Sequence, residues 1–512
     1  MDDEIELLRP HLLFLEQKGY HVDAISNGDD ALALLRDQPY DLLLLDEQMP
    51  GRRGLEVLEA LRREDPHARV VMVTKSEDDG TMTEAIGRRV DGYLVKPTSP
   101  RQVLSVVTRI LDGASIRQQQ VAQDFAGRFG RLTRLRSEAT TAEDFAGLYS
   151  ELVDWHTRLT ASGEMGLLDS VTSLLEEVRH DFGPWMRREY PRWMRGKGEA
   201  PELSVDLVRN HLLPLVGDDP VLFVVLDCMR LDQWRTLAPL LTEEFEIEES
   251  LHFSILPSAT PYSRNAIFSG LYPDDIARKR PEWWGAIRDE GSLNAFEDEL
   301  LREQLAELCG RPVPVHYEKV FSDRDGDQLR GRVNSALRTR GGVLALVFNF
   351  MDILIHTRSE SAVFMEVARD EISLRDLTRS WFERSTVRTL LADAAREGHR
   401  VVVTTDHGSI HCNRPTTVFA RKDATSNLRY KFGSDVRAEH GSTVFTTKDP
   451  GDLRLPEEGR VQSYVLAMED FFLVYPTKLR EYQARYRGAF LHGGVSPEEV
   501  IVPVATLTPR AG

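Results

Sequence analysis

Three apolar segments in the second half of the chain are each followed within a few residues by an aspartate, and this repetition constrains the fold more than any other feature. The segments with their acids are Val221–Leu226 with Asp227, Val343–Phe348 with Asp352, and Val401–Val403 with Asp406. Short runs of this composition, alternating with helical patterns, predict the buried strands of a parallel sheet. Since ligands of open α/β sheets gather at the carboxyl ends of the strands, the three carboxylates are expected to meet at one edge.

Histidines accompany two of these acids and stand alone at a fourth position. The pairs and the single residue are Asp352 with His356, Asp406 with His407, and His492 before two glycines. A lone Asp-x-x-x-His or Asp-His-Gly is common on solvated helices and turns. Three acids and three histidines after successive strands have no such explanation, and mixed nitrogen and oxygen donors favour two zinc ions over Mg²⁺ or Ca²⁺.

The segment LPSATPYSRNAIFSGLYP carries the candidate nucleophile, Thr260, at the start of a predicted helix. A helix N-terminus offers free N–H groups and the positive end of its dipole to an anion. Threonine also caps helices well, and this role is compatible with a catalytic one. Arg264 and Asn265 are candidates for contacts to the oxygens of a bound phosphate, and an exposed arginine on a helix face is an equally good interpretation of Arg264.

In order and type, these residues resemble the metal and nucleophile pattern of the alkaline phosphatase superfamily, most closely its PglZ-type and nucleotide pyrophosphatase/phosphodiesterase-like domains. The resemblance covers residues 201–512. It implies one zinc ion on Asp352, His356 and His492, and a second on Asp227, Asp406, His407 and the Thr260 oxygen.

The chemistry that follows is a metal-assisted displacement at phosphorus. Zinc lowers the pKa of a bound hydroxyl, so the Thr260 oxygen is expected to attack in line with the leaving oxygen, through a phosphothreonine intermediate. Monoesterases of this superfamily add cationic contacts to the doubly charged phosphate, and the sequence shows no clear equivalent. That absence favours phosphodiesters such as nucleotides or oligonucleotides.

The first part of the chain places polar groups at strand ends in a different order. Asp46 directly follows an apolar run, Thr74 and Lys96 follow the next two, and Asp2 and Asp3 open the chain. Carboxylates suit Mg²⁺, while a lysine and a threonine hydroxyl can hold the oxygens of an acyl phosphate on Asp46.

This set resembles the receiver domain of response regulators, over about residues 1–113. The resemblance implies that Asp46 is the phosphoacceptor and that magnesium is held by Asp2, Asp3 and Asp46. It also implies that Lys96 binds the phosphoryl group and that Thr74 and Tyr93 report phosphorylation.

Receivers begin with a buried central strand before the acidic pair, whereas this chain opens at the pair itself. Loss of that strand would leave backbone groups of its two neighbours unpaired. We therefore expect that the start is mis-assigned, with an initiating valine codon read as Met1. The intact mass of the natural protein tests this expectation, which a mass beginning at Met1 would contradict.

Residues 114–200 show helical periodicity without strand signals, as in the spacing of Leu148, Leu152 and Trp155 with Leu159. Pro184, Pro191 and the stretch Gly196–Pro201 predict breaks at the end of this region.

The expected architecture is therefore α/β in three parts. A flavodoxin-like receiver occupies 1–113, a helical linker bundle 114–200, and an alkaline-phosphatase-like α/β domain 201–512.

The succession of these parts resembles the PorX-type response regulators of the type IX secretion system, across essentially the whole chain. That resemblance implies a partner histidine kinase, a homodimer formed on phosphorylation, and contacts with a sigma factor and the secretion motor. One possible function is that of an enzyme, in which phosphorylation of Asp46 alters dimerisation and thereby access to the zinc cleft. A scaffold with a structural zinc site that signals through partner binding is the alternative. Structural sites are usually closed and four-coordinate, so carboxylates beside a threonine favour the enzyme.

Composition excludes several other classes. A net charge of −18, from 64 basic and 82 acidic residues, argues against broad neutralisation of duplex nucleic acid. No apolar run approaches the ~20 residues that span a bilayer, and the acidic start does not resemble a secretory signal. Three cysteines do not form a disulfide framework. We expect a cytoplasmic protein without membrane insertion. The sequence contains no helix-turn-helix motif that would indicate direct DNA binding.

Overall fold

The computed structural model describes residues 1–65, 68–75, 90–288, 294–321, 326–338, 341–358, 362–421, 424–425, 427–456 and 463–510. The chain forms two compact units. One comprises Met1–Gly127 with Ala161–Glu164, and the other comprises Arg128–Thr160 with Met165–Gly512. The first unit contains the receiver, and the second contains most of the linker helices together with the C-terminal domain, which we call the effector domain.

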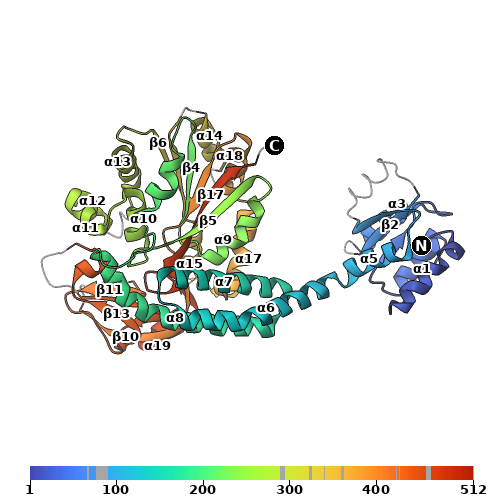
Figure 1. Cartoon of the computed structure of the whole chain (residues 1–512), viewed down its shortest axis with the longest axis horizontal. Coiled ribbons are helices and arrows are strands. Elements are labelled where there is room, and N and C mark those ends of the chain that lie inside the picture. Colours follow the sequence, from blue (N-terminus) through green and yellow to red (C-terminus); the bar gives the residue numbers. More distant parts are fainter. Residues whose placement is uncertain are drawn as a thin grey trace. The chain divides into compact units, whose positions relative to one another are not determined.

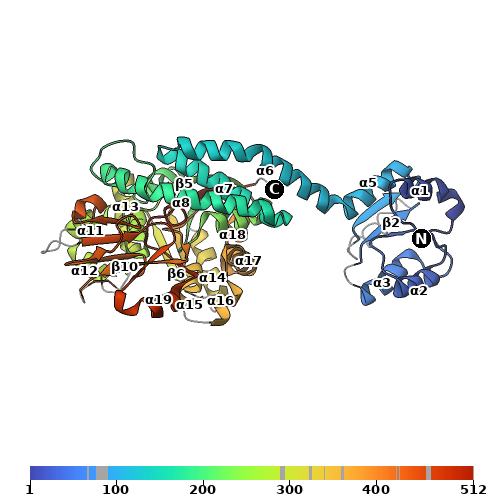
Figure 2. The ribbon, with the colours of Figure 1, turned by 90° about the horizontal axis from the view of Figure 1, so that it is seen from below.

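The receiver has a parallel sheet in the order β1-β2-β3, formed by Leu43–Leu45, Val70–Thr74 and Gly92–Val95. Helix α1 packs with α5 and α2 packs with α3, on opposite faces of the sheet (Figure 2). These helices are α1 (Ile5–Gln17), α2 (Gly28–Asp37), α3 (Gly54–Glu64) and α5 (Pro100–Leu111). The predicted flavodoxin-like α/β class of this part is confirmed.

Met1 and Asp2 pack against this sheet. The Met1 amino group donates to the Leu44 carbonyl at 2.7 Å, and the Asp46 N–H donates to the Met1 carbonyl at 3.0 Å. The Asp2 N–H donates to the Ile25 carbonyl at 3.0 Å. A cavity of about 470 Å³ lies beside them, lined by side chains of α1, β1 and residues 19–25. The contacts bring Asp2 to the same end of the sheet as Asp46.

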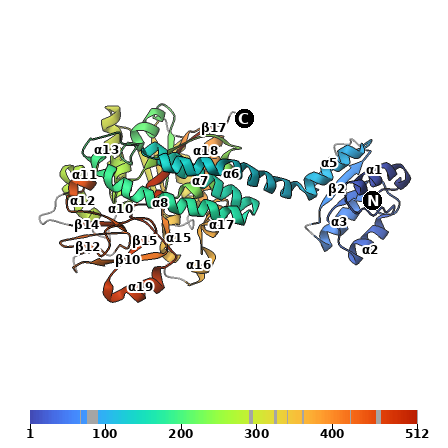
Figure 3. The same ribbon diagram turned by 60° about the horizontal axis from the view of Figure 1, so that its bottom comes forward.

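The linker is helical, as predicted, and the structure builds it from three long helices. These are α6 (Gly113–Glu138), α7 (Ala142–Ser162) and α8 (Met165–Met194). The residues that carried the helical periodicity, Leu148, Leu152, Trp155 and Leu159, are all buried on α7. Helices α7 and α8 lie side by side along the effector domain (Figures 1 and 3). In the described part of the chain, no helix combines the length and hydropathy needed to cross a bilayer.

The breaks predicted at Pro184 and Pro191 are wrong, because both prolines lie inside α8. Proline lacks the N–H that a helix interior uses, so tertiary packing must compensate. Phe182 and Trp185 supply that packing. Their rings lie 5.5 and 4.7 Å from the ring of Phe145 on α7, and Phe182 also lies 6.4 Å from Phe253 of the effector sheet. This aromatic cluster joins the linker to the effector domain.

The effector domain is built on a six-stranded sheet in the order β5-β17-β8-β4-β7-β6. The strands are β4 (Val221–Leu226), β5 (Phe245–Phe253), β6 (Val315–Val320), β7 (Val343–Phe348), β8 (Val401–Thr404) and β17 (Ile501–Pro509). Strands β6, β7, β4 and β8 are parallel, and β17 runs antiparallel to β8 and β5. Strands β4 and β7 have the bounds of the predicted apolar runs, because they are buried on both faces.

Helices cover both faces of this sheet (Figure 1). Val221, Phe223 and Val225 alternate along β4 and pack with residues of α10 (Thr260–Ser269) and α13 (Glu297–Cys309). The other helices of the domain are α9 (Leu231–Leu237), α11 (Pro273–Lys279), α12 (Pro281–Arg288), α14 (Gly326–Leu337), α15 (Phe350–Arg358), α16 (Ala362–Val367), α17 (Glu371–Phe382), α18 (Thr386–Arg396), α19 (Leu479–Tyr486) and α20 (Pro497–Val500). Burial on both sides fixes the carboxyl edge of the sheet, where the candidate site lies.

Three smaller sheets, which the sequence pattern did not predict, lie beside the main one (Figure 3). Their strands are β9 (Ile410–Cys412), β10 (Arg414–Phe419), β11 (Tyr430–Gly433), β12 (Arg437–Ala438), β13 (Val444–Thr447), β14 (Ser463–Ala467), β15 (Phe471–Val474) and β16 (Ala489–Leu491). The pairing of β16 with β9 leads the chain into His492.

Removing the ring of Phe182 should destabilise the linker and effector domain together. Phe182 is fully buried, so Phe182→Ala leaves a cavity at the junction and should cost about 3–5 kcal/mol of unfolding free energy. Met165→Ala on the same helix is the control, because Met165 is 57% exposed and its loss should change stability by less than about 0.5 kcal/mol. Equal effects of the two changes in denaturant unfolding would show that the junction contributes little.

Candidate metal centre

The carboxyl ends of β4, β7 and β8 bring three acids together. Asp227 directly follows β4, Asp352 lies in the first turn of α15 after β7, and Asp406 lies two residues beyond β8. The sheet therefore delivers all three side chains to one edge, and the three histidines join them in two groups of potential metal ligands.

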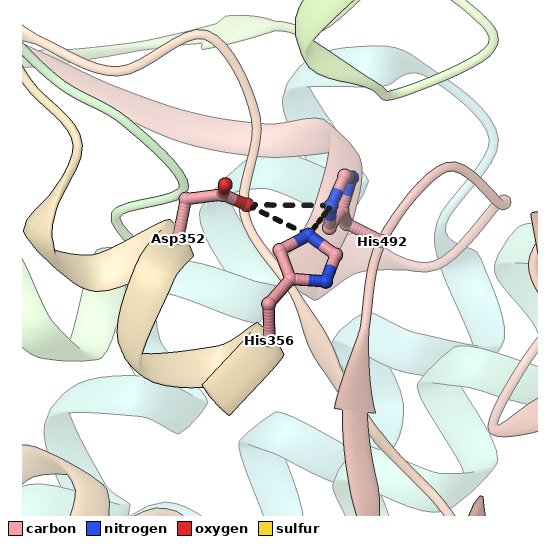
Figure 4. Close-up of side chains that lie close together, drawn as sticks. All are labelled: Asp352, His356 and His492. Carbon is pink, nitrogen blue, oxygen red and sulfur yellow. Dashed lines mark hydrogen bonds and ion pairs between the residues drawn. The ribbon is translucent and has the colours of Figure 1, made fainter. Parts of the chain in front are cut away.

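The first group is Asp352, His356 and His492 (Figure 4). Asp352 Oδ1 lies 3.3 Å from His356 Nε2 and 3.4 Å from His492 Nε2, and the two imidazole nitrogens are 3.3 Å apart. Donors held at ~2.0–2.1 Å around a tetrahedral ion lie ~3.3 Å from one another. The spacing of these three atoms therefore fits a single ion of the size of zinc.

The second group is Asp227, Asp406 and His407, with Thr260 beside it. Thr260 Oγ1 lies 3.0 Å from His407 Nε2 and 3.5 Å from Asp227 Oδ1. The rings of His407 and His492 stack with centroids 4.3 Å apart, so the two groups are neighbours. The threonine hydroxyl is thus part of the same cluster of donors as the acids.

Hydrogen bonds leave one oxygen of each acid in the second group for a cation. Asp227 Oδ2 accepts from Arg264 at 2.6 Å and Asn349 at 2.8 Å, so Oδ1 faces the group. Asp406 Oδ1 accepts from the N–H groups of Cys228 and His407, whereas its Oδ2 is buried without a hydrogen-bond partner among the described residues. A buried carboxylate oxygen of this kind is costly unless a cation binds it, so the donor set fits a metal ion.

His407 is held in one tautomer. Its Nδ1–H donates a hydrogen bond to the Gly408 carbonyl at 3.0 Å, so the lone pair of the ring is on Nε2. Burial, together with nearby His492, lowers the pKa of His407 to about 3, so the ring is neutral at physiological pH. A neutral imidazole with a free Nε2 lone pair is the form that binds metal.

Burial has the opposite effect on the pKa of the acids, which it raises. It raises the pKa of Asp227 to about 7, against the attraction of Arg264, and raises the pKa of Asp406. At Asp352 burial is outweighed by hydrogen bonds from His356 and His492, which lower the pKa. A bound cation would favour the ionised form of all three acids.

Arg264 and Asn265 differ from the sequence-based expectation. Arg264 is 1% exposed, and its donors are used by Asp227 and by Glu297, which accepts from Nε at 2.5 Å. Asn265 donates to the Pro261 carbonyl within its own helix at 2.8 Å. This geometry favours a positioning role for Arg264 over contact with phosphate oxygens. The expected exposure of Arg264 on a helix face is wrong, because the ion pairs bury it.

The N-terminus of α10 also differs in part from the sequence-based expectation of free N–H groups. Thr260 is its first residue, as predicted, but the N–H groups of Tyr262 and Ser263 donate to the Ala259 carbonyl at 2.9 and 3.0 Å. These two groups are therefore not free for an anion, which leaves the N–H of Thr260 itself and the helix dipole.

Three further side chains hold the site, and the sequence analysis missed them. Asn349 and Glu297 act through Asp227 and Arg264, and the Asn294 amide donates to the Thr260 carbonyl at 3.3 Å. Asn349 carried a detectable signal, since it is a polar residue directly after the apolar run of β7. Glu297 and Asn294 had none, because their role depends on how α13 packs against α10.

In the receiver, Lys96 contacts two of the three acids predicted for the site, Asp2 and Asp46, and Asp3 is exposed. Its Nζ lies 2.5 Å from Asp2 Oδ2 and 2.7 Å from Asp46 Oδ2. Thr74, at the end of β2, is fully buried, and its carbonyl accepts from the Lys96 N–H at 2.8 Å. Tyr93 lies on β3, paired in register with Met72.

The acids at the start of the chain form a third group of potential metal ligands, made of Asp2, Asp3 and Glu4. Asp46 is not within that group and contacts Lys96 instead. Although burial opposes it, the contacts with Asp2 and Asp46 raise the pKa of Lys96, so its cation balances the two carboxylates.

Three stretches of the chain match known families. Residues 1–108 match the response regulator receiver domain, residues 115–194 the PorX response regulator linker domain, and residues 207–507 the BREX system PglZ alkaline phosphatase-like domain. The last match covers more than half of the chain.

Individual proteins that resemble this chain match only part of its length. The transcriptional regulatory protein ResD of Bacillus subtilis is 36% identical over 115 residues, which are 22% of this chain and 48% of ResD. The alginate biosynthesis transcriptional regulatory protein AlgB of Pseudomonas aeruginosa is 38% identical over 217 residues, or 41% of this chain and 45% of AlgB. This chain spans about half the length of these relatives. A CheY-like receiver domain from Methanospirillum hungatei is 28% identical, covering 22% of this chain and 90% of that one, with a TM-score of 0.21.

The loop after β8 leaves no room for a side chain at Gly408. A Cβ atom there would lie 2.0 Å from the carbonyl oxygen of Glu498, which is backbone and cannot yield without moving α20. Gly408→Ala should therefore displace the neighbouring Asp406 and His407 and weaken metal binding by about 10- to 100-fold. Gly441→Ala is the control, because nothing lies within 4 Å of its Cβ position. Competition with a chromophoric chelator measures both, and equal affinities would contradict the assignment of this loop.

Proposed function

Since the chain belongs to the PglZ alkaline phosphatase-like family, behind the receiver and linker of PorX-type response regulators, we propose that its receiver controls a zinc-dependent phosphodiesterase. The receiver implies a partner histidine kinase, and the PglZ domain implies phosphoester chemistry. The observation that carries the proposal is Thr260 Oγ1, 3.0 Å from His407 Nε2 and 3.5 Å from Asp227 Oδ1, in a cluster of metal-type donors.

Two zinc ions, held by the two groups of ligands, would supply the Lewis acidity that lowers the pKa of the Thr260 hydroxyl and stabilises the leaving oxygen. Thr260 Oγ1 then attacks phosphorus, and a new P–O bond forms as the bond to the leaving alcohol breaks. The intermediate is a phosphodiester that joins the Thr260 oxygen to the remaining alcohol of the substrate, and the Thr260 proton leaves with the departing alcohol. Water cleaves this intermediate in a second displacement that restores the hydroxyl, so one diester and one water give a monoester and an alcohol.

The chain's own residues hold this geometry. The Gly408 carbonyl fixes the His407 tautomer, and Arg264 and Asn349 bind Asp227 Oδ2 so that Oδ1 faces the donors. Such fixed contacts keep the reacting oxygen in place without reorganisation during the reaction. In the receiver, Asp46 would accept the phosphoryl group, with Mg²⁺ on the nearby acids and Lys96 balancing the charge.

The ion pairs of Arg264 with two carboxylates support phosphodiesters as the substrates. A monoester dianion calls for additional positive charge, and Arg264 is already neutralised by Asp227 and Glu297. We therefore infer that nucleotides or oligonucleotides are the substrates. The PorX linker match supports a role in regulating type IX secretion, with a sigma factor and the secretion motor as partners and a homodimer as the phosphorylated form.

Replacing Thr260 by alanine removes the proposed nucleophile but only one of the donors to the second ion. Hydrolysis of bis(p-nitrophenyl) phosphate should fall by roughly 10³-fold or more, while zinc content stays near two ions per chain. Thr260→Ser keeps the hydroxyl and should keep part of the activity. Unchanged turnover in Thr260→Ala would reject the nucleophile and favour the alternative, a scaffold with a structural zinc site.

Asp46→Asn should abolish phosphorylation of the receiver, because the amide cannot form an acyl phosphate. Asp41→Asn is the control, since Asp41 is an exposed acid before β1 and should leave phosphorylation unchanged. Incorporation from acetyl phosphate, followed by separation of the phosphorylated form on a phosphate-binding gel, measures both. Equal incorporation in the two variants would place the phosphoacceptor elsewhere.

A further inference from the structure

Helix α8 of the linker contributes Arg179, whose side chain is 12% exposed, to the back of the metal centre. Arg179 Nε donates to Glu498 Oε1 at 2.6 Å, and Arg179 Nη2 donates to Glu371 Oε1 at 3.3 Å. Glu498 is 1% exposed and lies in α20, six residues after His492. A linker side chain thus forms ion pairs with two acids of the effector domain.

From Glu371 the contacts continue to the loop after β4. Arg230, three residues beyond Asp227, lies 3.5 Å from Glu371 Oε1, and its Nε donates to Asp232 at 2.8 Å. Arg230 Nη1 donates to the Ser409 carbonyl at 3.1 Å, in the loop that carries Asp406 and His407. Arg230 therefore ties the strand ends of β4 and β8 together behind the donors.

The same loop packs directly on α20. The Gly408 N–H donates to the Glu499 carbonyl at 3.0 Å, and the carbonyl of Glu498 would lie 2.0 Å from a Cβ at Gly408. A shift of Glu498 would therefore move the backbone next to His407. Arg179, which holds Glu498, acts on that backbone through one intermediate residue.

The network is balanced in charge and closely packed. Its three cations face three acids, namely Arg179, Arg230 and Arg375 with Asp232, Glu371 and Glu498. Burial raises the pKa of Glu371, but Arg230 and Arg179 outweigh it and lower the pKa to about 2. The groups enclose a cavity of only about 10 Å³, which has room for at most one water molecule. This cluster is therefore not a ligand pocket, and its charged side chains form ion pairs with one another.

A second contact from α8 reaches the nucleophile segment. The Leu256 N–H donates to the hydroxyl oxygen of Tyr190 at 2.9 Å, four residues before Thr260. Tyr190 is fully buried. One linker helix therefore touches both the segment that leads to Thr260 and the loops that carry metal ligands.

We propose that Arg179 is a positioning residue of the metal centre, which acts through Glu498, Glu371 and Arg230 on the loops that carry Asp227, Asp406 and His407. The linker helix is then part of the scaffold that sets metal affinity. This inference rests on the proposed metal-dependent function.

Arg179→Met in the full-length protein tests the inference. Removing the guanidinium takes from Glu498 its ion pair with Arg179 and leaves Glu371 paired with Arg230. Metal affinity should fall about tenfold or more, with a lower kcat and a nearly unchanged KM for bis(p-nitrophenyl) phosphate. Arg179→Lys keeps the charge and should recover part of the affinity. Arg188→Met on the same helix is the control, because the Arg188 side chain is 62% exposed and, among the described residues, its ion pair is with the neighbouring Glu189.

Zinc dissociation constants from chelator competition are measured alongside thermal unfolding of each variant. Lower thermal stability of Arg179→Met with zinc affinity equal to that of Arg188→Met would overturn the positioning role, as would failure of Arg179→Lys to restore affinity in a folded protein. If Arg179→Met does not fold, Arg179→Gln replaces it as the charge-removing variant, since a tenfold loss of affinity against Arg188→Met supports the proposal and equal affinity overturns it. Absence of zinc binding in the unmodified protein would instead reject the proposed function itself.

Discussion

The mutual repulsion of buried acids at one sheet edge is the constraint on which the effector domain depends. Two like charges ~4 Å apart repel by roughly 4 kcal/mol at an effective dielectric constant of about 20. Asp227, Asp352 and Asp406 come together because parallel strands end side by side, and burial alone would drive them towards protonation. Arg264 offsets part of this repulsion from within the core, and the three histidines supply nitrogen donors. The arrangement is that of a site built to hold divalent cations.

Much of this edge is visible in the sequence, for a definite physical reason. Strands β4 and β7 are buried on both faces, so their residues form unbroken apolar runs, and the first polar residue after each marks the point where the chain reaches solvent or a ligand. The start of α10 is marked by Thr260 and the proline after it. Local composition carries both signals.

Other features depend on contacts between distant segments, which local patterns do not record. Glu297 reaches the site only because α13 packs against α10, and Arg179 meets Glu498 across 319 positions of the chain. The prolines inside α8 were misjudged because aromatic packing, not local propensity, stabilises that helix. The small sheets of the effector domain were missed because their strands are short and only partly apolar.

The aromatic junction between α8 and β5 also bears on how such proteins are assembled in evolution. Phe182 and Trp185 would become solvent-exposed if the linker were separated from the effector domain, and a new neighbour would have to provide the same apolar surface. Recombination that separates α8 from the effector domain is therefore disfavoured. Shuffling of modules would tend to exchange receivers while the linker and the PglZ domain are inherited as one piece.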